Sequence, residues 1–329
     1  MKNDLGLNTV LLLVLVLVFL ASLLAGQVWL PISAVYRDAF SHSPGLAGLI
    51  VTELRLPRAV LATLVGAALG LSGGVLQALT RNPLAEPGLL GTSAGAALGA
   101  VLAIYFGMTS LFELTGPLLG MAGAVGATTL TFALGRGSGM IALVLAGAAV
   151  SGLATAGIAL ALNLAPNPYA AYEIMSWLMG SLEDRGWNHV QLVLPFVLVG
   201  GGVLFTLGRA LDALSLGEQQ AASLGIELQR LNALVILGTA LAVGAATAVT
   251  GAIGFIGLVA PHLIRPFVKH QPSRILIPSA LLGSIVLLGA DICSRLLPIG
   301  PGLKIGVLTS LIGTPFFFWL VVKLRKVAL

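Results

Sequence analysis

Long apolar segments, separated by short polar stretches, make up most of the chain. A helix needs roughly 20 apolar residues to cross the hydrocarbon core of a bilayer. Segments of that kind occur at about 10–30, 56–80, 89–107, 114–135, 141–164, 191–211, 231–250, 251–268, 275–294 and 304–322. The alternating pattern of a transmembrane β-barrel is absent. The pattern predicts an all-α polytopic membrane protein with about ten transmembrane helices in a single domain, residues 1–329.

Composition agrees with that prediction. The chain is 57% hydrophobic and 9% charged, with a mean hydropathy of +1.03, whereas about a quarter of the residues of a soluble globular protein are charged. Little chain remains outside the apolar segments, so a separate soluble domain does not fit. We expect residues 10–30 to be a retained helix rather than a cleaved signal peptide, because the apolar run is long and Trp29 suits an interface.

The basic residues predict an orientation. With ten spans and a cytoplasmic N-terminus, most of the 17 lysines and arginines fall in cytoplasmic loops, as the positive-inside bias requires. Both termini are then cytoplasmic. Topology also explains the pI of about 9.7, so the expected surroundings are membrane lipid and no nucleic acid. Cys293 is the only cysteine, which excludes a disulfide or a thiolate metal site within one chain.

A polar interruption lies between the second and third apolar segments. Pro83 and Pro87 stand four residues apart, and neither can continue a helix because each lacks an N–H and clashes with the preceding turn. The helix before this stretch is therefore expected to end near Thr80, and the next to begin at about Gly91. Two interpretations stay open, namely an ordinary turn and a gate or partner contact.

Two features are predicted at the outer face. Arg55 and Arg58 stand at the outer end of the second helix, against the topological bias. Either an acidic partner or phospholipid headgroups would explain them. Residues of about 170–182 form an apolar run too short to span, which predicts a short helix at the outer face.

The main cytoplasmic loop covers about residues 208–230. Residues 218–224 are good helix formers followed by Gly225, a residue suited to a helix C-terminus. A short helix exposed on the inner face predicts docking of a partner, and a loop helix without a partner is the alternative.

The ionisable residues do not indicate catalysis. His262 has no second metal-ligating residue nearby and is interpreted as structural. Asp291 and Arg295 are spaced four apart, acid first, as in a helical ion pair. Since there is also no phosphate-binding loop, uphill transport by this chain would need energy from another subunit.

Taken together, these stretches resemble the FecCD-type permeases, the membrane subunits of ABC importers for iron–siderophores, haem and vitamin B12. The matching residues run in order along the chain: Arg55-Leu-Pro-Arg58, Asn82-Pro-Leu-Ala-Glu-Pro87, Trp177-Leu-Met-Gly180, Gly217-Glu218 with Leu224-Gly225, Gly251 to His262, Ala290-Asp291 with Arg295, and Gly306-Val-Leu-Thr309 with Gly313-Thr-Pro-Phe316.

The resemblance implies the type II ABC importer permease fold in a bacterial inner membrane. It also implies a permease homodimer, two ATPase subunits and a periplasmic or lipid-anchored substrate-binding protein. No cofactor is expected in this chain, because the ATPase partner would bind ATP and Mg. The chain would be a transport subunit and no enzyme.

Site residues follow from the same resemblance. Those matching the family's contact with the binding protein are Arg55, Arg58 and Arg295. Those matching the ATPase coupling helix are Gly217, Glu218, Ala221, Leu224 and Gly225. Those matching the inner gate are Asn82, Leu84, Met140 and Ile141. Lys304 departs from the family pattern, which often has an acidic residue nearby, and it is expected to make the outer face more positive.

The expected cargo is an iron complex, either haem or a ferric siderophore. Met140 and Ile141 are bulkier than the small hydroxyl residues at these positions in vitamin B12 permeases, which disfavours cobalamin, although cobalamin remains the alternative. A more remote alternative is a secondary transporter coupled to an ion and working without an ATPase.

Overall fold

The computed structural model describes residues 2–26, 30–31, 33, 38, 45–135, 139–297 and 303–327, and the regular elements among them are all helical. In chain order these are α1 (Lys2–Leu24), α3 (Leu46–Leu49), the π-helix η1 (Ile50–Arg55), α4 (Leu56–Leu79), η2 (Pro87–Leu90), α5 (Thr92–Tyr105), η3 (Met108–Ser110), α6 (Thr115–Gly135), α7 (Gly139–Asn163), α8 (Pro168–Leu178), α9 (Trp187–Thr206), α10 (Gly208–Leu214), α11 (Glu218–Ser223), α12 (Leu228–Thr250), α13 (Ile256–Ile264), η4 (Arg265–Val268), α14 (Pro272–Leu296) and α15 (Ile305–Val327).

The predicted number of spans is confirmed. Among the described residues, seven helices are long and apolar enough to cross a membrane, and three shorter apolar helices lie at Thr92–Tyr105, Ile256–Val268 and Ile305–Leu320. Each matches one predicted span. Large apolar side chains stay exposed along α1, α6 and α7, as expected of helices that face lipid or another subunit.

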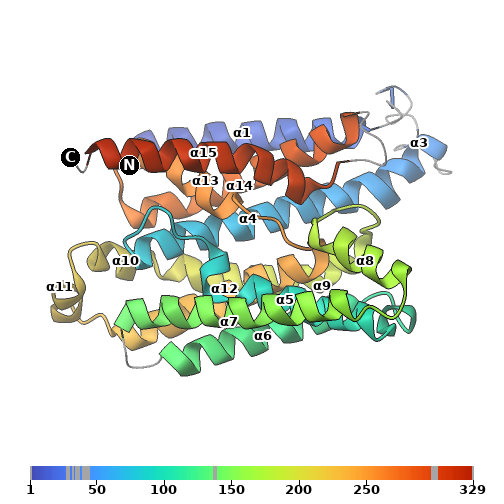
Figure 1. Ribbon diagram of the computed structural model, residues 1–329. Coiled ribbons are helices and arrows are strands. Elements are labelled where there is room, and N and C mark those ends of the chain that lie inside the picture. Colours follow the sequence, from blue (N-terminus) through green and yellow to red (C-terminus); the bar gives the residue numbers. More distant parts are fainter. Residues whose placement is uncertain are drawn as a thin grey trace.

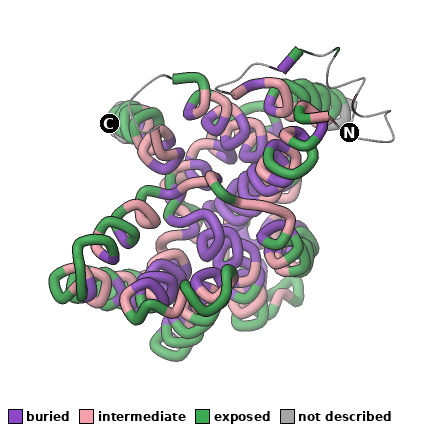
Figure 2. Tube along the Cα trace, turned by 90° about the vertical axis from the view of Figure 1, so that its right-hand side faces the viewer, coloured by how far each residue is buried: buried purple, intermediate pink, exposed green. Residues whose placement is uncertain are grey.

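The long helices run roughly side by side (Figure 1). Helices α1 and α15 lie along one side, α6 and α7 lie along the other, and α4, α12 and α14 pass between them. Buried residues are concentrated through the middle of the bundle (Figure 2), where α4, α9, α12 and α14 share one apolar core. The Lys2 end of α1, the Val327 end of α15 and helices α10 and α11 lie at one end of the bundle, whereas α3 and α8 lie toward the other.

The second predicted span, residues 56–80, begins earlier than expected. Residues 46–55 continue directly into α4 as one 34-residue helix. The apolar residues at 46–51 support a helix, and the wider π-turn at Ile50–Arg55 precedes Pro57, whose ring and missing N–H disturb a regular helix. Residues 32, 34–37 and 39–44 lie outside the described residues.

Glycines allow close contacts between helices, and several recur at intervals of four residues, such as Gly66, Gly70 and Gly74. A Cβ atom at Gly70 would lie 2.1 Å from the carbonyl oxygen of Ser279 in α14, and one at Gly99 would lie 2.1 Å from that of Leu119 in α6. Each of these helix pairs therefore packs backbone against backbone, as small residues permit in membranes.

We predict that Gly70→Ala destabilises the purified protein by about 1–3 kcal/mol, the usual cost of overpacking, because the new methyl group must push α14 away. Thermal unfolding in detergent measures this. The matched control is Gly126→Ala, since a Cβ atom at this exposed position in α6 would have no neighbour within 4 Å. Equal melting temperatures for the two variants would contradict the close α4–α14 contact.

Candidate functional site

Two helices of the bundle are interrupted, and the interruptions define the candidate site. Helix α5 has 14 residues and α13 has nine. At 1.5 Å per residue, α5 spans about 21 Å and α13 still less, against about 30 Å of hydrocarbon. The connections at 80–91 and 251–255 must therefore complete the crossings. Non-helical backbone at that depth is tolerated where protein surrounds it or where it lines a cavity.

The two connections contact each other. A Cβ atom at Gly257 would lie 2.8 Å from the ring of Pro87. The side chain of Glu86, which precedes Pro87, is partly buried. Phe255 has a φ of 67°, in the left-handed region that residues with a Cβ atom rarely adopt. The break before α5 and the break before α13 thus form one unit.

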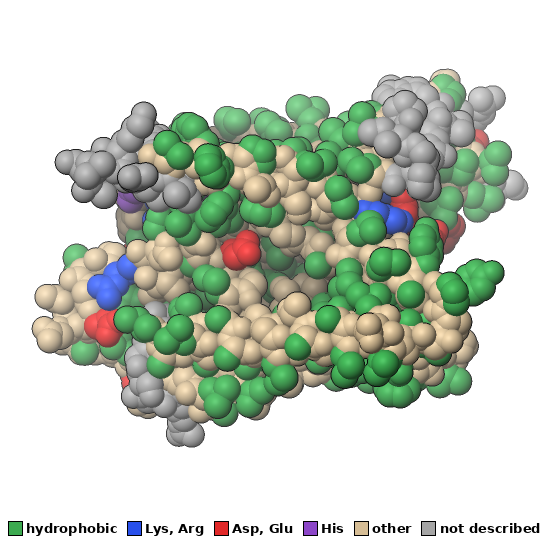
Figure 3. Space-filling model, viewed as in Figure 1, with side chains coloured by type: hydrophobic (Ala, Val, Ile, Leu, Met, Phe, Trp, Pro, Cys, Tyr) green, Lys and Arg blue, Asp and Glu red, His purple; other side chains and the backbone are tan. Residues whose placement is uncertain are grey.

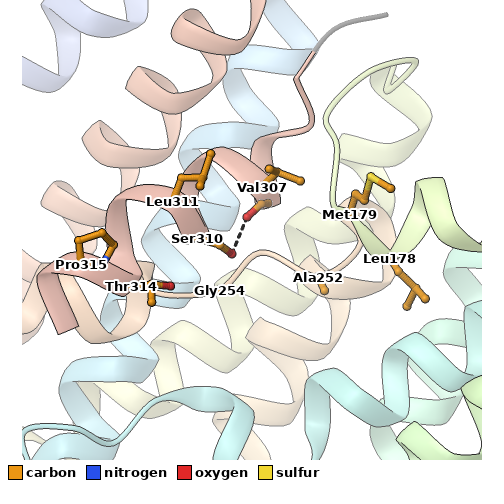
Figure 4. A pocket seen from close by; sticks show the side chains of 10 residues that line it. Leu178, Met179, Ala252, Gly254, Val307, Ser310, Leu311, Thr314 and Pro315 are labelled. Atoms are coloured by element: carbon orange, nitrogen blue, oxygen red, sulfur yellow. Dashed lines mark hydrogen bonds between the residues drawn. The ribbon is translucent and has the colours of Figure 1, made fainter. Parts of the chain in front are cut away.

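A hollow opens on the face that carries this unit. In the space-filling view it runs between the upper and lower helices (Figure 3). Its best-defined part is a cavity of about 750 Å³ lined by Leu178, Met179, Ala252, Gly254, Gly306, Val307, Ser310, Leu311, Thr314 and Pro315. In the close view, α15 covers the connection that contains Ala252 and Gly254 (Figure 4), and the Ser310 hydroxyl donates to the Gly306 carbonyl at 2.7 Å. The lining is apolar apart from hydroxyl and backbone groups.

Two glycines bring separate segments together at the edge of this cavity. A Cβ atom at Gly251 would lie 2.2 Å from the Trp177 carbonyl oxygen, and one at Gly306 would lie 2.2 Å from that of Met179. The backbone N–H of Ser181 donates to the Thr250 carbonyl at 2.7 Å. The end of α8, the break after α12 and the start of α15 therefore meet, although they are far apart in sequence.

The predicted gate residues lie on two sides of this region. The Asn82 side chain accepts a hydrogen bond from the backbone N–H of Leu84 at 2.9 Å, which forms the turn after α4. Ile141 is 78% exposed at the start of α7, and the Met140 side chain lies outside the described residues. The connection does pack on α7, because a Cβ atom at Gly147 would lie 2.0 Å from the Leu89 carbonyl oxygen. Assignment of these residues to a gate stays a prediction.

Two of the three predicted docking arginines, Arg58 and Arg295, pair with one acid. Asp291 is fully buried, and its carboxylate lies 2.7 Å from Arg58 Nη2 and 2.8 Å from Arg295 Nη2. The pairing with Arg295 confirms the sequence prediction, whereas Arg58 is a second partner that spacing alone did not indicate. Arg55 lies close enough to affect Arg295 electrostatically. Arg55, Arg58, Arg295 and Asp291 thus form a cluster of charged side chains at this end.

The same arginines hold the outer end of α1. Arg55 Nη1 donates to the carbonyl oxygens of Leu23 and Leu24, at 3.0 and 2.7 Å. Arg295 Nη1 donates to those of Ser22 and Ala25, at 3.0 and 2.7 Å. The last carbonyls of a helix have no partner within it and carry partial negative charge, so two cations stabilise this end. The arginines are thus mostly buried, and Arg55 is only 8% exposed.

Further charges at the outer face are compensated within the chain. Lys304 forms an ion pair with Glu183, so the additional positive charge expected from Lys304 is largely neutralised. Burial lowers the pKa of Arg185, in the loop before α9, while the carboxylates of Asp184 and Glu113 act in the opposite direction.

The predicted coupling segment contains a short helix, α11, at the end of the bundle where both described chain termini lie. Gly217 and Gly225 bound it with φ values of 117° and 83°, which favour glycine. Ala221 is fully buried, whereas Leu224 is 63% exposed. Ala221 therefore packs inside the chain, and a partner could contact Leu224.

Two residues at this end were not predicted from sequence. Arg81, from the interruption after α4, lies 3.4 Å from Glu218 of α11. Asp212 of α10 accepts hydrogen bonds from the backbone N–H and the hydroxyl of Ser273, at 2.8 and 2.6 Å, at the start of α14. The contact of Asp212 with the start of α14 has no signal in the sequence, because α10 and α14 are far apart in the chain and only the fold makes them neighbours.

The interpretation of His262 as structural stands as a prediction. Its ring meets that of Phe316 edge to face, with centroids 5.8 Å apart. Among the described residues, no group of three potential metal-ligating side chains occurs.

We predict that Asp291→Asn lowers the free energy of unfolding by about 3 kcal/mol, because it leaves buried guanidinium groups without a counter-ion. Thermal and denaturant unfolding in detergent measure the change. Glu53→Gln, at an exposed acid near the same end, serves as the control. Unchanged stability of Asp291→Asn would show that the arginines do not depend on this carboxylate.

Comparisons with known proteins agree with this architecture. The FecCD transport family matches residues 13–323. The haemin transport system permease protein HmuU of Yersinia pestis is 37% identical over 329 residues, covering 96% of this chain and 95% of HmuU. The vitamin B12 import system permease protein BtuC of Yersinia enterocolitica is 38% identical over 322 residues, covering 96% of this chain and 92% of BtuC.

A solved structure has the same fold. It is described as "an inward-facing conformation of a putative metal-chelate type ABC transporter", and it superposes with a TM-score of 0.87 at 33% identity, covering 97% of this chain and 99% of its own. The extent of the match confirms the fold and the resemblance seen in the sequence. The chain belongs to the FecCD transport family and is a multi-pass permease of an ABC importer.

Proposed function

We propose that two copies of this chain pair across the hollow between α7 and α15 and carry an iron complex, haem or a ferric siderophore, into the cytoplasm by alternating access. The observation that carries this proposal is the open cavity of about 750 Å³ beside two interrupted helices. Its weakly polar wall suits a passage that releases a large cargo. A ligand shifts a conformational equilibrium only by differential affinity for its states, so tight binding by the wall is not required.

The relatives support the choice of cargo without separating the candidates. Relatives are named for haemin, iron chelatin and vitamin B12 transport. The bulky, exposed Ile141 at the start of α7 favours an iron complex over cobalamin, which remains the second candidate.

The energy source would be a pair of ATPase subunits that bind ATP and Mg and contact α11. Helices α10 and α11 lie at the same end as both described chain termini. This end would face the cytoplasm of a bacterium, with the permease in the inner membrane.

A periplasmic or lipid-anchored binding protein would dock at the opposite end. Arg55, Arg58 and Arg295 lie there near the buried carboxylate of Asp291. Acidic residues of the partner would contact the remaining exposed edge of this cluster. The inward hydrogen bonds of the arginines keep that edge in place.

The direct test is uptake into proteoliposomes that contain the permease, its ATPase and its binding protein, with haem, a ferric siderophore and cobalamin compared. We expect uptake of haem or the siderophore, with stimulated ATP hydrolysis. Uptake of cobalamin alone would correct the cargo. Uptake without ATP that survives deletion of residues 217–225 would contradict the importer mechanism.

We predict that Leu224→Asp weakens ATPase binding by at least about tenfold, as expected for a central apolar contact of an interface. Pull-down and titration calorimetry in detergent measure the affinity. The control is Leu111→Asp, which is 77% exposed on the connection between α5 and α6. ATPase binding of both variants at wild-type affinity would exclude Leu224 from the interface.

We also predict that Arg58→Glu weakens docking of the binding protein, more so when combined with Arg55→Glu. Arg58→Glu also places a second carboxylate beside that of Asp291. Arg58→Gln, which removes the positive charge without adding a carboxylate, is therefore measured in parallel. The stability of each variant is checked by thermal unfolding. Affinity is measured at low salt, where exposed charges are least screened. Wild-type affinity for all folded variants would remove these arginines from the docking site.

A further inference from the structure

Helix α14 takes its N-terminal cap from another helix. Gln271 stands at its N-cap position, with a φ of −76° and a ψ of 118°, and within the described first turn its side chain accepts no hydrogen bond from a backbone N–H. Pro272 follows and has no N–H. Ser273 therefore carries the first backbone N–H of α14 that needs a partner, at a helix end that favours negative charge.

Asp212, in α10, supplies the acceptor. Its Oδ1 accepts from the backbone N–H of Ser273 at 2.8 Å. Its Oδ2 accepts from the Ser273 hydroxyl at 2.6 Å and from the side-chain amide of Gln271 at 2.9 Å. Hydrogen bonds to an ionised carboxylate are shorter and stronger than those between neutral groups. Because Asp212 is half-buried, water competes for these bonds less than it would at an open surface.

Packing brings α10 to the same place. A Cβ atom at Gly208 would lie 3.1 Å from Cβ of Ser273 and 3.6 Å from the side chain of Leu276. Leu211, the residue before Asp212, is fully buried and belongs to the same apolar cluster as Leu276. Polar and apolar contacts thus join the same pair of helices.

Helix α10 leads directly into α11. Only residues 215–217 separate the two helices. The backbone N–H of Gly217 donates to the Leu214 carbonyl at 3.0 Å, and that of Ala221 donates to the Gly217 carbonyl at 2.9 Å. Ala221 is fully buried in the apolar cluster that contains Leu214. A displacement of α11 therefore reaches α10 over a short, hydrogen-bonded connection.

Helix α14 extends from this contact to the opposite end of the bundle. It has 25 residues, which at 1.5 Å per residue is about 37 Å. Near its other end, Asp291 and Arg295 belong to the charged cluster that includes Arg58. Between the two ends α14 packs on α4, where a Cβ atom at Gly66 would lie 2.5 Å from the Gly283 carbonyl oxygen. Movement at the start of α14 must therefore shift α4, the charged cluster, or both.

We propose that Asp212 is a positioning residue for transport, which holds α10 and α11 against the start of α14 so that displacement of α11 moves α14. This role rests on the proposed ATP-driven mechanism, whereas the three hydrogen bonds of Asp212 exist in the permease alone. A cap would only stabilise α14. A contact that joins two helices also transmits movement from one to the other.

The N-cap position of Gln271 allows these two roles to be separated. Asp212→Ala removes both the cap and the contact between the helices. Adding Gln271→Asp to it places a carboxylate at the N-cap position, where it can accept from a backbone N–H of the first turn. Helix α14 then regains a cap without a contact to α10. Ser273→Ala removes the hydroxyl donor alone, and Glu173→Ala, at an exposed acid of α8, is the matched control.

The first measurement is hydrogen–deuterium exchange of the permease alone in nanodiscs, which reports local opening. Asp212→Ala is expected to speed exchange about tenfold in residues 208–223 and at the start of α14, as loss of a hydrogen bond to a charged group would. Adding Gln271→Asp is expected to slow exchange again at the start of α14 but not in residues 208–223. Glu173→Ala should exchange like the parent.

Two results of this measurement overturn the proposal. One is parent-like exchange of residues 208–223 in Asp212→Ala. The other is recovery of those residues on adding Gln271→Asp, since a cap would then be sufficient. If Asp212→Ala does not fold, Ser273→Ala decides, because it should speed exchange in residues 208–223 to a smaller extent, and unchanged exchange overturns the proposal.

The second measurement is uptake of haem and of a ferric siderophore per ATP hydrolysed, in the reconstituted assembly. Asp212→Ala is expected to lower this ratio about tenfold, and the ratio should stay low on adding Gln271→Asp. A parent-like ratio in either variant overturns transmission through Asp212. If the parent takes up neither ligand, the proposed function fails, while the exchange comparison still decides whether Asp212 joins the helices.

Discussion

The structure depends on the need to satisfy backbone hydrogen bonds within a membrane. Lipid offers no partner to a free N–H or C=O group, so a break in a helix at that depth has to be enclosed by protein or line a cavity. Here two breaks, at 80–91 and 251–255, meet each other and support one side of a cavity. Helix-breaking prolines and an extended glycine-rich stretch are tolerated because Pro87 packs against Gly257 and Phe255 packs against α15.

The charged side chains near the C-terminal end of α1 are likewise given partners within the protein. Arginines that suggest a docking surface in the sequence are joined to a buried carboxylate and to the last carbonyls of α1. They anchor a helix that otherwise makes few buried contacts. An acidic partner would then complete an existing cluster, which gives docking a rigid, pre-formed surface and makes each arginine important for stability as well.

Local patterns were sufficient to predict most of the elements. Apolar length gave the ten spans, proline and glycine gave the break after α4 and the bounds of α11, and the spacing of Asp291 and Arg295 gave their pairing. Contacts between distant segments had no local signal. The pairing of Arg58 with Asp291, the burial of Ala221, and the packing of Phe255 against Gly313 all depend on how α4, α11 and α13 pack against their neighbours. Residues 46–55 were not predicted to extend the helix at 56–80.

The central claim is that the hollow beside α15 is an aqueous passage and no lipid-facing groove. Labelling of single cysteines by a charged, membrane-impermeant maleimide tests it in the reconstituted assembly, in a Cys293→Ser background. Leu311 lies in the cavity wall, whereas the side chain of Leu17 is 66% exposed on α1. A single cysteine is placed at each of these positions. The account predicts that Leu311→Cys reacts readily and that Leu17→Cys does not. Equal protection of both positions would mean that the hollow faces lipid, and would contradict the account.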